Sequence, residues 1–588
     1  MQWSEFALRV TGGLAGAVCV GSLVFAVFFE SHTCGELPER ARRYLRGAAL
    51  CAPVWGAAGL LLAWQGGGDR GELTAAILTA LLTVVLALVG GTARGWRTAC
   101  ALVFVALLGL VVPAVERRSD GGPGHDIGTN TIVMHVLAAT VWFGVLLVLG
   151  SRLWRDEERA QTLLARYRTL AGCCWALLVF SGVFDVLAVP RRYGEGEAGH
   201  LALVLGKTFV TVALGGLGVL ARRHLVPAEP TGRGGRRRAL LWLVGVEAVL
   251  LTSALLVSTV MIGTASGPAA SEVTASESVL GYDLAVPPSA VALVTGWRFD
   301  PLFGGAAVVL SGLYLAGVRV LRRRGDAWPT GRTAAWITGW GCVLWVTSSG
   351  MGVYAGGVFS LHMFVHMVLN MVAPVLLVLG GPVTLALRAL PARGRGAAAG
   401  PREWLLAVLH SPLTRVLAGP GVATVLFVGS FYALYFTDLF ELGMFEYWGH
   451  QLMKTHFLLV GYLYYWTVIG VDPGPRPLPH LARLGVVLAV MPFHAFFGII
   501  TMSLSSPLAE DFYRALELPW PRDLLADQFL GGGIAWAMGE VPLVLVLGAL
   551  LTQWYRHDTR LARRVDRSDD ELAAYNAMLA ELARKRGG

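Results

Sequence analysis

The apolar segment Ser360–Gly380 carries histidines and methionines at helical spacing. His362 and His366 are four residues apart and therefore share one face of a helix. Met363 and Met367 repeat this spacing on the adjacent strip. Imidazole and thioether groups are ligands for soft or borderline metal ions, above all copper, so the segment predicts metal or haem ligation. The structural alternative is that the methionines fill gaps while the histidines make hydrogen bonds at the membrane interface.

Two other apolar segments of the second half also carry histidines or methionines, near the ends that we predict to face outside. These are His450, Met453 and His456 in Trp448–Gly470, and His494 in Leu481–Met502. Polar side chains inside a membrane are costly and are usually retained for function. Because five histidines from three helices fall in one layer, we predict that they line a shared copper site with the neighbouring methionines. Hydrogen bonding and packing remain the ordinary alternatives for each of them.

The first half offers a thinner candidate, His135, in the stretch MHVLAATVWFG near the outer end of its apolar segment. As a metal ligand, His135 would extend a copper path into this half of the chain. The charged residue Lys454 lies between His450 and His456, and we expect it to reach outward or to pair with Glu446 or Glu540.

The composition is that of a membrane protein. The chain has 588 residues, of which 55% are hydrophobic and 15% charged, whereas soluble domains average roughly 25% charged residues. Fifteen apolar segments of about 20 residues predict an all-α, polytopic membrane helix bundle. The net charge is +9, but the arginines lie in short loops between apolar runs. We therefore expect a lipid bilayer around the chain and no nucleic-acid partner.

The loops also predict the orientation and the domains. Lysines and arginines concentrate in alternate loops, which places the N-terminus outside and the C-terminus in the cytoplasm, with a multi-pass chain in the plasma membrane. The predicted units are residues 1–264 with eight spans, an outer linker at 265–298, residues 299–556 with seven spans, and a charged cytoplasmic tail at 557–588. The linker composition suits an extended or partly ordered connector.

Common catalytic motifs are missing from the sequence. It contains no HExxH, GxSxG or zinc-type cysteine pair, and its seven cysteines include no CxxC. We therefore expect no soluble catalytic domain and no enzymatic turnover.

The second half, about Pro301 to Gln553, resembles the CtaG family of membrane proteins, which is implicated in the assembly of haem–copper cytochrome c oxidase. The matching stretches are LHMFVHMVLNMVAPVLLVLG, GHQLMKTHFLLVGYLYYWTVIGVDP, MPFHAFFGIITMSL and DQFLGGGIAWAMGEVP. By this resemblance the family's motif histidines correspond to His362, His366, His450, His456 and His494, and its last motif contains Asp527, Gln528, Trp536 and Glu540.

The first half, about Leu45 to Ile262, resembles the CopD copper-resistance family. The stretches that carry this resemblance are MHVLAATVWFG, LGKTFVTVALGGLG and VEAVLLTSALLVSTVMIG. Together the two resemblances imply copper as the bound metal, with oxidase subunits or extracytoplasmic copper chaperones as partners.

Three functions remain open on the sequence. The first is a copper-handling protein that captures extracytoplasmic copper on histidine and methionine and transports or delivers it. The second is a redox protein whose histidines ligate haem. The third is a scaffold for oxidase assembly in which the histidine layer binds no metal.

Overall fold

In a computed structural model of the chain, the structure describes residues 3–30, 34–67, 69–116, 123–155, 160–193, 198–220, 232–264, 273–393, 399–475 and 478–586. Helices make up nearly all regular structure in these ranges, and the β contact found there is an isolated bridge between Glu36 and Gly95. The predicted all-α class is therefore confirmed.

Long helices form the described part of the N-terminal half. They are α1 (Trp3–Phe28), α2 (Glu39–Gln65), α3 (Arg70–Gly90), α4 (Trp96–Glu116), α5 (His125–Arg155), α6 (Ala160–Tyr193), α7 (Ala198–Leu220) and α8 (Gly232–Thr264). α1 and α5 cross in close contact because glycines meet at the crossing. A Cβ atom on Gly21 would lie 2.1 Å from the carbonyl carbon of Gly144, so a larger residue would force the two helices apart.

The linker contains two short helices, α9 (Ala275–Leu280) and α10 (Ala290–Thr295). Each begins with a hydroxyl cap: Thr274 accepts a hydrogen bond from the backbone N–H of Glu277, and Ser289 accepts one from Ala292. The predicted connector is thus ordered from residue 273 onward, and the part at 265–272 lies outside the described residues.

The C-terminal half mixes long helices with short and broken ones. Its described helices are α11 (Pro301–Arg323), α12 (Thr330–Ser348), α13 (Gly350–Tyr354), α14 (Phe359–Met367), the π-helix η3 (Val368–Val372), α15 (Ala373–Gly380), α16 (Pro382–Ala389), α17 (Pro401–Leu409), α18 (Pro412–Leu417), α19 (Pro420–Tyr435), α20 (Leu439–Phe445), α21 (Tyr447–Ile469), α22 (His480–Ser503), α23 (Glu510–Ala515) and α24 (Leu524–Arg586).

Every predicted apolar span falls on a helix. Among the described residues, twelve helices are long and apolar enough to cross a membrane, and α19 with α20 forms a thirteenth candidate that is bent by 75°. The other two predicted spans are α12 and α21, of 19 and 23 residues. The chain is therefore a multi-pass helical membrane protein, and its orientation in the membrane remains a prediction.

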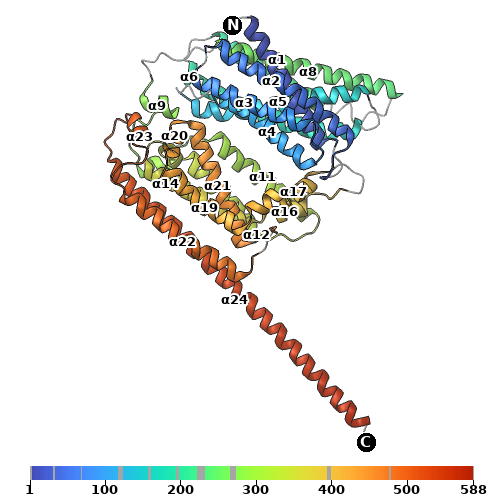
Figure 1. The fold of residues 1–588 in the computed structure, drawn as a ribbon, viewed down its shortest axis with the longest axis vertical. Coiled ribbons are helices and arrows are strands. Elements are labelled where there is room, and N and C mark those ends of the chain that lie inside the picture. Colours follow the sequence, from blue (N-terminus) through green and yellow to red (C-terminus); the bar gives the residue numbers. More distant parts are fainter. Residues whose placement is uncertain are drawn as a thin grey trace.

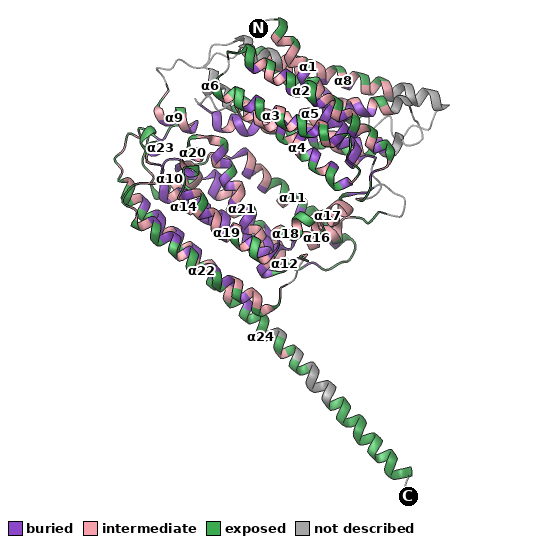
Figure 2. Cartoon of the chain, in the orientation of Figure 1, coloured by how far each residue is buried: buried purple, intermediate pink, exposed green. Residues whose placement is uncertain are grey.

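The two halves pack side by side, each around its own apolar core. Figure 1 shows the blue-to-green N-terminal helices against the yellow-to-red C-terminal ones, with the end of α24 extending beyond the bundle. Trp404 on α17 packs edge-on against Phe28 of α1, with ring centroids 4.9 Å apart. Figure 2 shows buried residues within the bundle and exposed ones along the last turns of α24, where Leu572 and Tyr575 are exposed.

Candidate metal centre

The first turn of α14 is fixed by a carboxylate from another helix. Asp527 on α24 accepts hydrogen bonds from the backbone N–H groups of Phe359, at 2.7 Å, and Ser360, at 3.2 Å. An acidic side chain at a helix N-terminus satisfies free N–H groups and favours the helix dipole. This contact sets the position of α14, which carries His362 and His366 on its next turns.

The predicted single helix over Ser360–Gly380 is interrupted just after these histidines. The π-helix η3 inserts an extra residue at 368–372, and such insertions are frequent at functional sites. Asn370 within η3 is fully buried, and neither polar atom of its side chain has a hydrogen-bond partner among the described residues. α21 passes close to η3 because residue 461 is glycine, where a Cβ atom would lie 2.3 Å from the carbonyl oxygen of Asn370.

This packing brings three histidines together from two helices. The ring centroids of His362 and His366 lie 4.1 Å apart, and the ring of His450 on α21 lies 5.2 and 5.8 Å from them. One ligand nitrogen from each residue can be chosen so that all three lie within 4.8 Å of one another. We refer to His362, His366 and His450 as the trihistidine centre.

Each ring of the trihistidine centre has a nitrogen that lacks a hydrogen bond of normal geometry to any described residue. These atoms are Nδ1 of His362 and Nε2 of both His366 and His450. A buried polar atom without a partner is costly, so each of the three nitrogens calls for a further partner. A metal ion satisfies all three at once, and neutral imidazole is a ligand for copper and zinc.

The opposite nitrogens of two of these rings meet one phenol. The hydroxyl of Tyr435 lies 3.0 Å from Nε2 of His362 and 3.0 Å from Nδ1 of His366. A neutral imidazole that binds a metal through one nitrogen carries its proton on the other, so both rings would then donate to the Tyr435 oxygen. Tyr435 is buried at the end of α19, where it orients both rings.

The other two predicted histidines do not join the trihistidine centre. His456 is half-buried on α21, and its ring lies 5.6 Å from that of Phe457. His494 on α22 is buried between Phe427 and Phe431, with ring centroids at 5.4 and 5.3 Å, and neither ring nitrogen has a partner among the described residues. The shared layer predicted from the sequence thus contains one compact group of three among the described side chains.

The predicted methionine ligands are part of an apolar core. Met363 and Met367 are fully buried and Met453 is buried, all within the core of the C-terminal half. The side chain of Met453 packs on Gly443, where a Cβ atom would lie 3.5 Å from the sulfur. Their packing is the structural alternative considered above, and their ligation of copper stays a prediction.

His135 contacts a hydroxyl within the N-terminal half. Its Nδ1 lies 3.0 Å from the hydroxyl of Ser181 on α6. A different histidine of this half, His125 at the start of α5, reaches the C-terminal half, where its ring packs edge-on against Tyr447 at 5.8 Å. The copper path through His135 stays a prediction.

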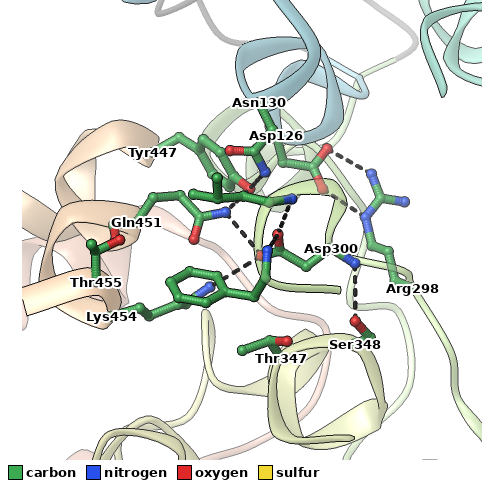
Figure 3. Close-up of polar contacts among 12 residues, drawn as sticks. Asp126, Asn130, Arg298, Asp300, Thr347, Ser348, Tyr447, Gln451, Lys454 and Thr455 are labelled. Atoms are coloured by element: carbon green, nitrogen blue, oxygen red, sulfur yellow. Dashed lines mark hydrogen bonds and ion pairs between the residues drawn. The ribbon is translucent and has the colours of Figure 1, made fainter. Parts of the chain in front are cut away.

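A buried polar network joins the two halves beside the trihistidine centre (Figure 3). Arg298 donates two hydrogen bonds to Asp126, at 2.7 and 2.6 Å. Lys454 lies 3.9 Å from Asp300, which also accepts a hydrogen bond from Gln451 at 2.9 Å. The prediction that Lys454 reaches outward or pairs with an acid is confirmed for the acid, but Glu446 and Glu540 were the wrong examples, because Asp300 at the N-terminus of α11 lies beside the ammonium group. The carboxylate of Glu446 instead accepts from the adjacent indole of Trp448, at 3.1 Å.

Sequence reasoning missed the residues that support the centre. Asp300 precedes Pro301 and caps α11, accepting from the backbone N–H groups of Leu302 and Phe303. An aspartate followed by proline is a recognisable helix start, so this position could have been found. Tyr435 gives no such signal, because its role depends on how α19 packs against α14.

The fold and site define a class: a multi-pass helical membrane protein with a candidate metal centre between α14 and α21. Residues 312–557 match the family described as cytochrome c oxidase caa3 assembly factor (Caa3_CtaG). Uncharacterized proteins of Mycobacterium bovis and Mycobacterium tuberculosis are each 39% identical over 601 residues, covering 97% of this chain and 89% of theirs. An uncharacterized protein of Mycobacterium leprae is 38% identical over 603 residues, with the same coverage. No solved structure shows a significant match.

The chain belongs to the same family as these mycobacterial proteins, and residues 312–557 of its C-terminal half match the Caa3_CtaG family. This confirms the resemblance of the second half to CtaG. The matched region contains all three histidines of the trihistidine centre and Tyr435. It ends before the exposed last turns of α24 and begins after the linker.

Proposed function

We propose that this protein binds copper(I) at the trihistidine centre and delivers it during the assembly of cytochrome c oxidase. One observation carries the proposal: three imidazoles from two helices converge within 4.8 Å, and each has a nitrogen without a partner among the described residues. The name of the matching family, an oxidase assembly factor, supplies the destination. Copper is the cargo in this proposal, and the protein acts by binding and release rather than by catalytic turnover.

The chemistry of the centre favours a monovalent ion. Its three ligands are neutral, so they add no negative charge to offset the charge of a bound ion. Leaving charge uncompensated in a buried site is costly, and the penalty is smaller for copper(I) than for a divalent ion. His362 and His366 are fully buried, with 0% of each side chain exposed. The soft character of copper(I) also suits imidazole with methionines nearby.

The geometry supports a single ion over haem. His362 and His366 extend from the same helix face with their rings only 4.1 Å apart. A haem needs a porphyrin-sized space around its axial ligands, whereas these rings and Tyr435 are packed directly against one another. The haem alternative therefore has less support than a compact metal site.

The proposal also covers the side of the membrane on which the centre lies and the proteins that would donate or receive copper. If the predicted orientation holds, the trihistidine centre lies near the outer face of a plasma membrane, where it would receive copper from extracytoplasmic chaperones. Oxidase subunits would then be the recipients. For the N-terminal half we propose a CopD-like role in copper uptake or resistance, on the motifs around His135 and in α7 and α8. This assignment rests on the sequence resemblance.

Oxidase maturation in cells grown on limiting copper tests the proposal. His362→Ala, His366→Ala and His450→Ala should each lower the amount of active oxidase, because each removes one ligand of the ion. His456→Ala is the matched control on the same helix as His450, since its ring packs on Phe457 outside the centre. Membrane levels of each variant are measured in parallel. Normal oxidase activity in all three ligand variants would favour the scaffold function and overturn the copper proposal.

A further inference from the structure

A small polar cavity lies between the two halves, directly beside the trihistidine centre. It offers about 50 Å³ to the centres of water-sized molecules, and one water needs roughly 10–15 Å³ by the same measure. The cavity therefore has room for a few water molecules or a partly hydrated ion. Its walls come from α5, the linker and the C-terminal half, and include Asp126, Tyr282, Thr347 and Met444.

His450 connects this cavity with the trihistidine centre. His362 and His366 are completely buried, whereas His450 is partly exposed and lines the cavity. Lys454, one helical turn further along α21, lines the same cavity. An ion that reaches the buried nitrogens of His362 and His366 from the cavity therefore meets His450 first.

The two ion pairs in the cavity wall differ in the distance between their charged groups. Asp126 and Arg298 are joined by two short hydrogen bonds, at 2.6 and 2.7 Å, a bidentate contact that is difficult to displace. Lys454 and Asp300 are 3.9 Å apart, beyond hydrogen-bond distance. Among the described residues, Oδ2 of Asp300 accepts one hydrogen bond, from Gln451, so an incoming cation could take the place of the more distant ammonium group at this oxygen.

A second observation points to a ligand at the same place. Gln451 donates from its amide nitrogen to Asp300 and to the hydroxyl of Tyr447. Its amide oxygen has no partner among the described residues, although only 6% of the residue is exposed. A buried acceptor beside a carboxylate whose ion pair is long is an arrangement that suits a cation or its hydration water.

We propose that this cavity is the access route of the trihistidine centre, with Asp300 as the carboxylate that attracts an incoming monovalent cation and Lys454 as the charge that restrains its passage to His450. The inference rests on the proposed function, because it assumes that the trihistidine centre binds copper(I). It adds a route, an acceptor carboxylate and an opposing charge, and it gives the junction between the two halves a role in metal loading.

The route predicts changes in rate rather than in final affinity. Asp300→Asn removes the carboxylate but retains a helix-capping side chain, so copper(I) should load at least about tenfold more slowly, with unchanged final occupancy. Lys454→Met removes the opposing charge and should accelerate loading by a comparable factor. Because both groups are buried, these effects should persist at high ionic strength, unlike effects of surface charge.

Cavity size supplies an independent test. Thr347 is buried against the cavity, and its hydroxyl bonds the carbonyl of Val343 in its own helix. Thr347→Leu fills part of the cavity with a larger side chain and should slow loading, whereas Thr347→Val keeps the shape of the side chain and should not. Asp438→Asn is the control for general electrostatics, because Asp438 is exposed at the start of α20.

The experiment is stopped-flow transfer of copper(I) from a chromogenic chelator to the purified full-length protein in nanodiscs. Slower loading in Asp300→Asn and Thr347→Leu, with faster loading in Lys454→Met and wild-type rates in both controls, supports the route. If the wild type binds copper(I) but all variants load at its rate, the route is overturned while the proposed function stands. A wild type that binds no copper(I) overturns both.

Discussion

Replacing Tyr435 with phenylalanine is a sharp perturbation of the trihistidine centre, because it removes one oxygen and leaves the ring. That oxygen lies 3.0 Å from a nitrogen of His362 and 3.0 Å from a nitrogen of His366. It therefore holds both rings with their other nitrogens directed away from the phenol. Without it, each ring loses the acceptor that fixes its tautomer and its orientation.

The expected loss of copper(I) affinity follows from the number of histidine rings that Tyr435 orients. Removing an outer hydrogen-bond partner of a metal-binding histidine typically lowers metal affinity 10- to 100-fold. Tyr435 serves two of the three rings, so we expect the upper part of this range. At roughly 1.4 kcal/mol per factor of ten, this is a loss of about 2–3 kcal/mol in binding free energy. Copper(I) would still bind, because all three ligands remain.

A competition titration against a copper(I) chelator measures this change in detergent-solubilised protein. Tyr432→Phe is the matched control, since Tyr432 lies on the same helix and its hydroxyl donates to the backbone carbonyl of Phe493 at 2.7 Å. The control should keep wild-type affinity. If Tyr435→Phe binds copper(I) within twofold of the wild type, Tyr435 does not orient the ligands and the proposed ligand atoms are wrong.

Three further predictions concern the supports of the site. Gly461→Ala places a methyl group 2.3 Å from the carbonyl oxygen of Asn370, so it should destabilise the fold by about 1–3 kcal/mol, seen as a lower thermal midpoint in detergent. Asp527→Ala leaves two N–H groups of α14 uncapped and should lower stability by about 0.5–2 kcal/mol; an unchanged denaturation midpoint would contradict the capping role. Arg298→Met leaves Asp126 as an unpaired buried charge and should cost about 3–5 kcal/mol, and the added change Asp126→Asn should restore part of that loss.

The helical architecture could be predicted from the sequence because the bilayer imposes it. Each apolar run of about 20 residues must satisfy its backbone internally, so its length and its flanking arginines predict a helix without knowledge of its neighbours. All fifteen predicted spans accordingly fall on helices. The same reasoning did not predict the π-helix after His366, since nothing in its apolar sequence distinguishes it from an α-helical turn.

The set of metal ligands was only partly predictable, because spacing within one helix does not determine how neighbouring helices are rotated. Spacing within one helix places His362 and His366 on the same face, and the structure confirms that their rings are adjacent. Which residues of other helices meet them depends on the rotation of each helix about its axis. That rotation brings His450 into the centre and leaves His494 between phenylalanines. The partner of Lys454 depends likewise on where α11 begins, because Asp300 is the residue that caps it.

X-ray absorption at the copper edge of the copper(I)-loaded protein tests the central claim most directly. The trihistidine centre predicts one copper per chain, surrounded by nitrogen at about 2.0 Å, the usual metal–imidazole distance. His362→Ala should abolish this signal, because it removes one of the three converging nitrogens. A copper site dominated by sulfur at about 2.3 Å that survives His362→Ala, or purified protein that retains no copper, would contradict the account.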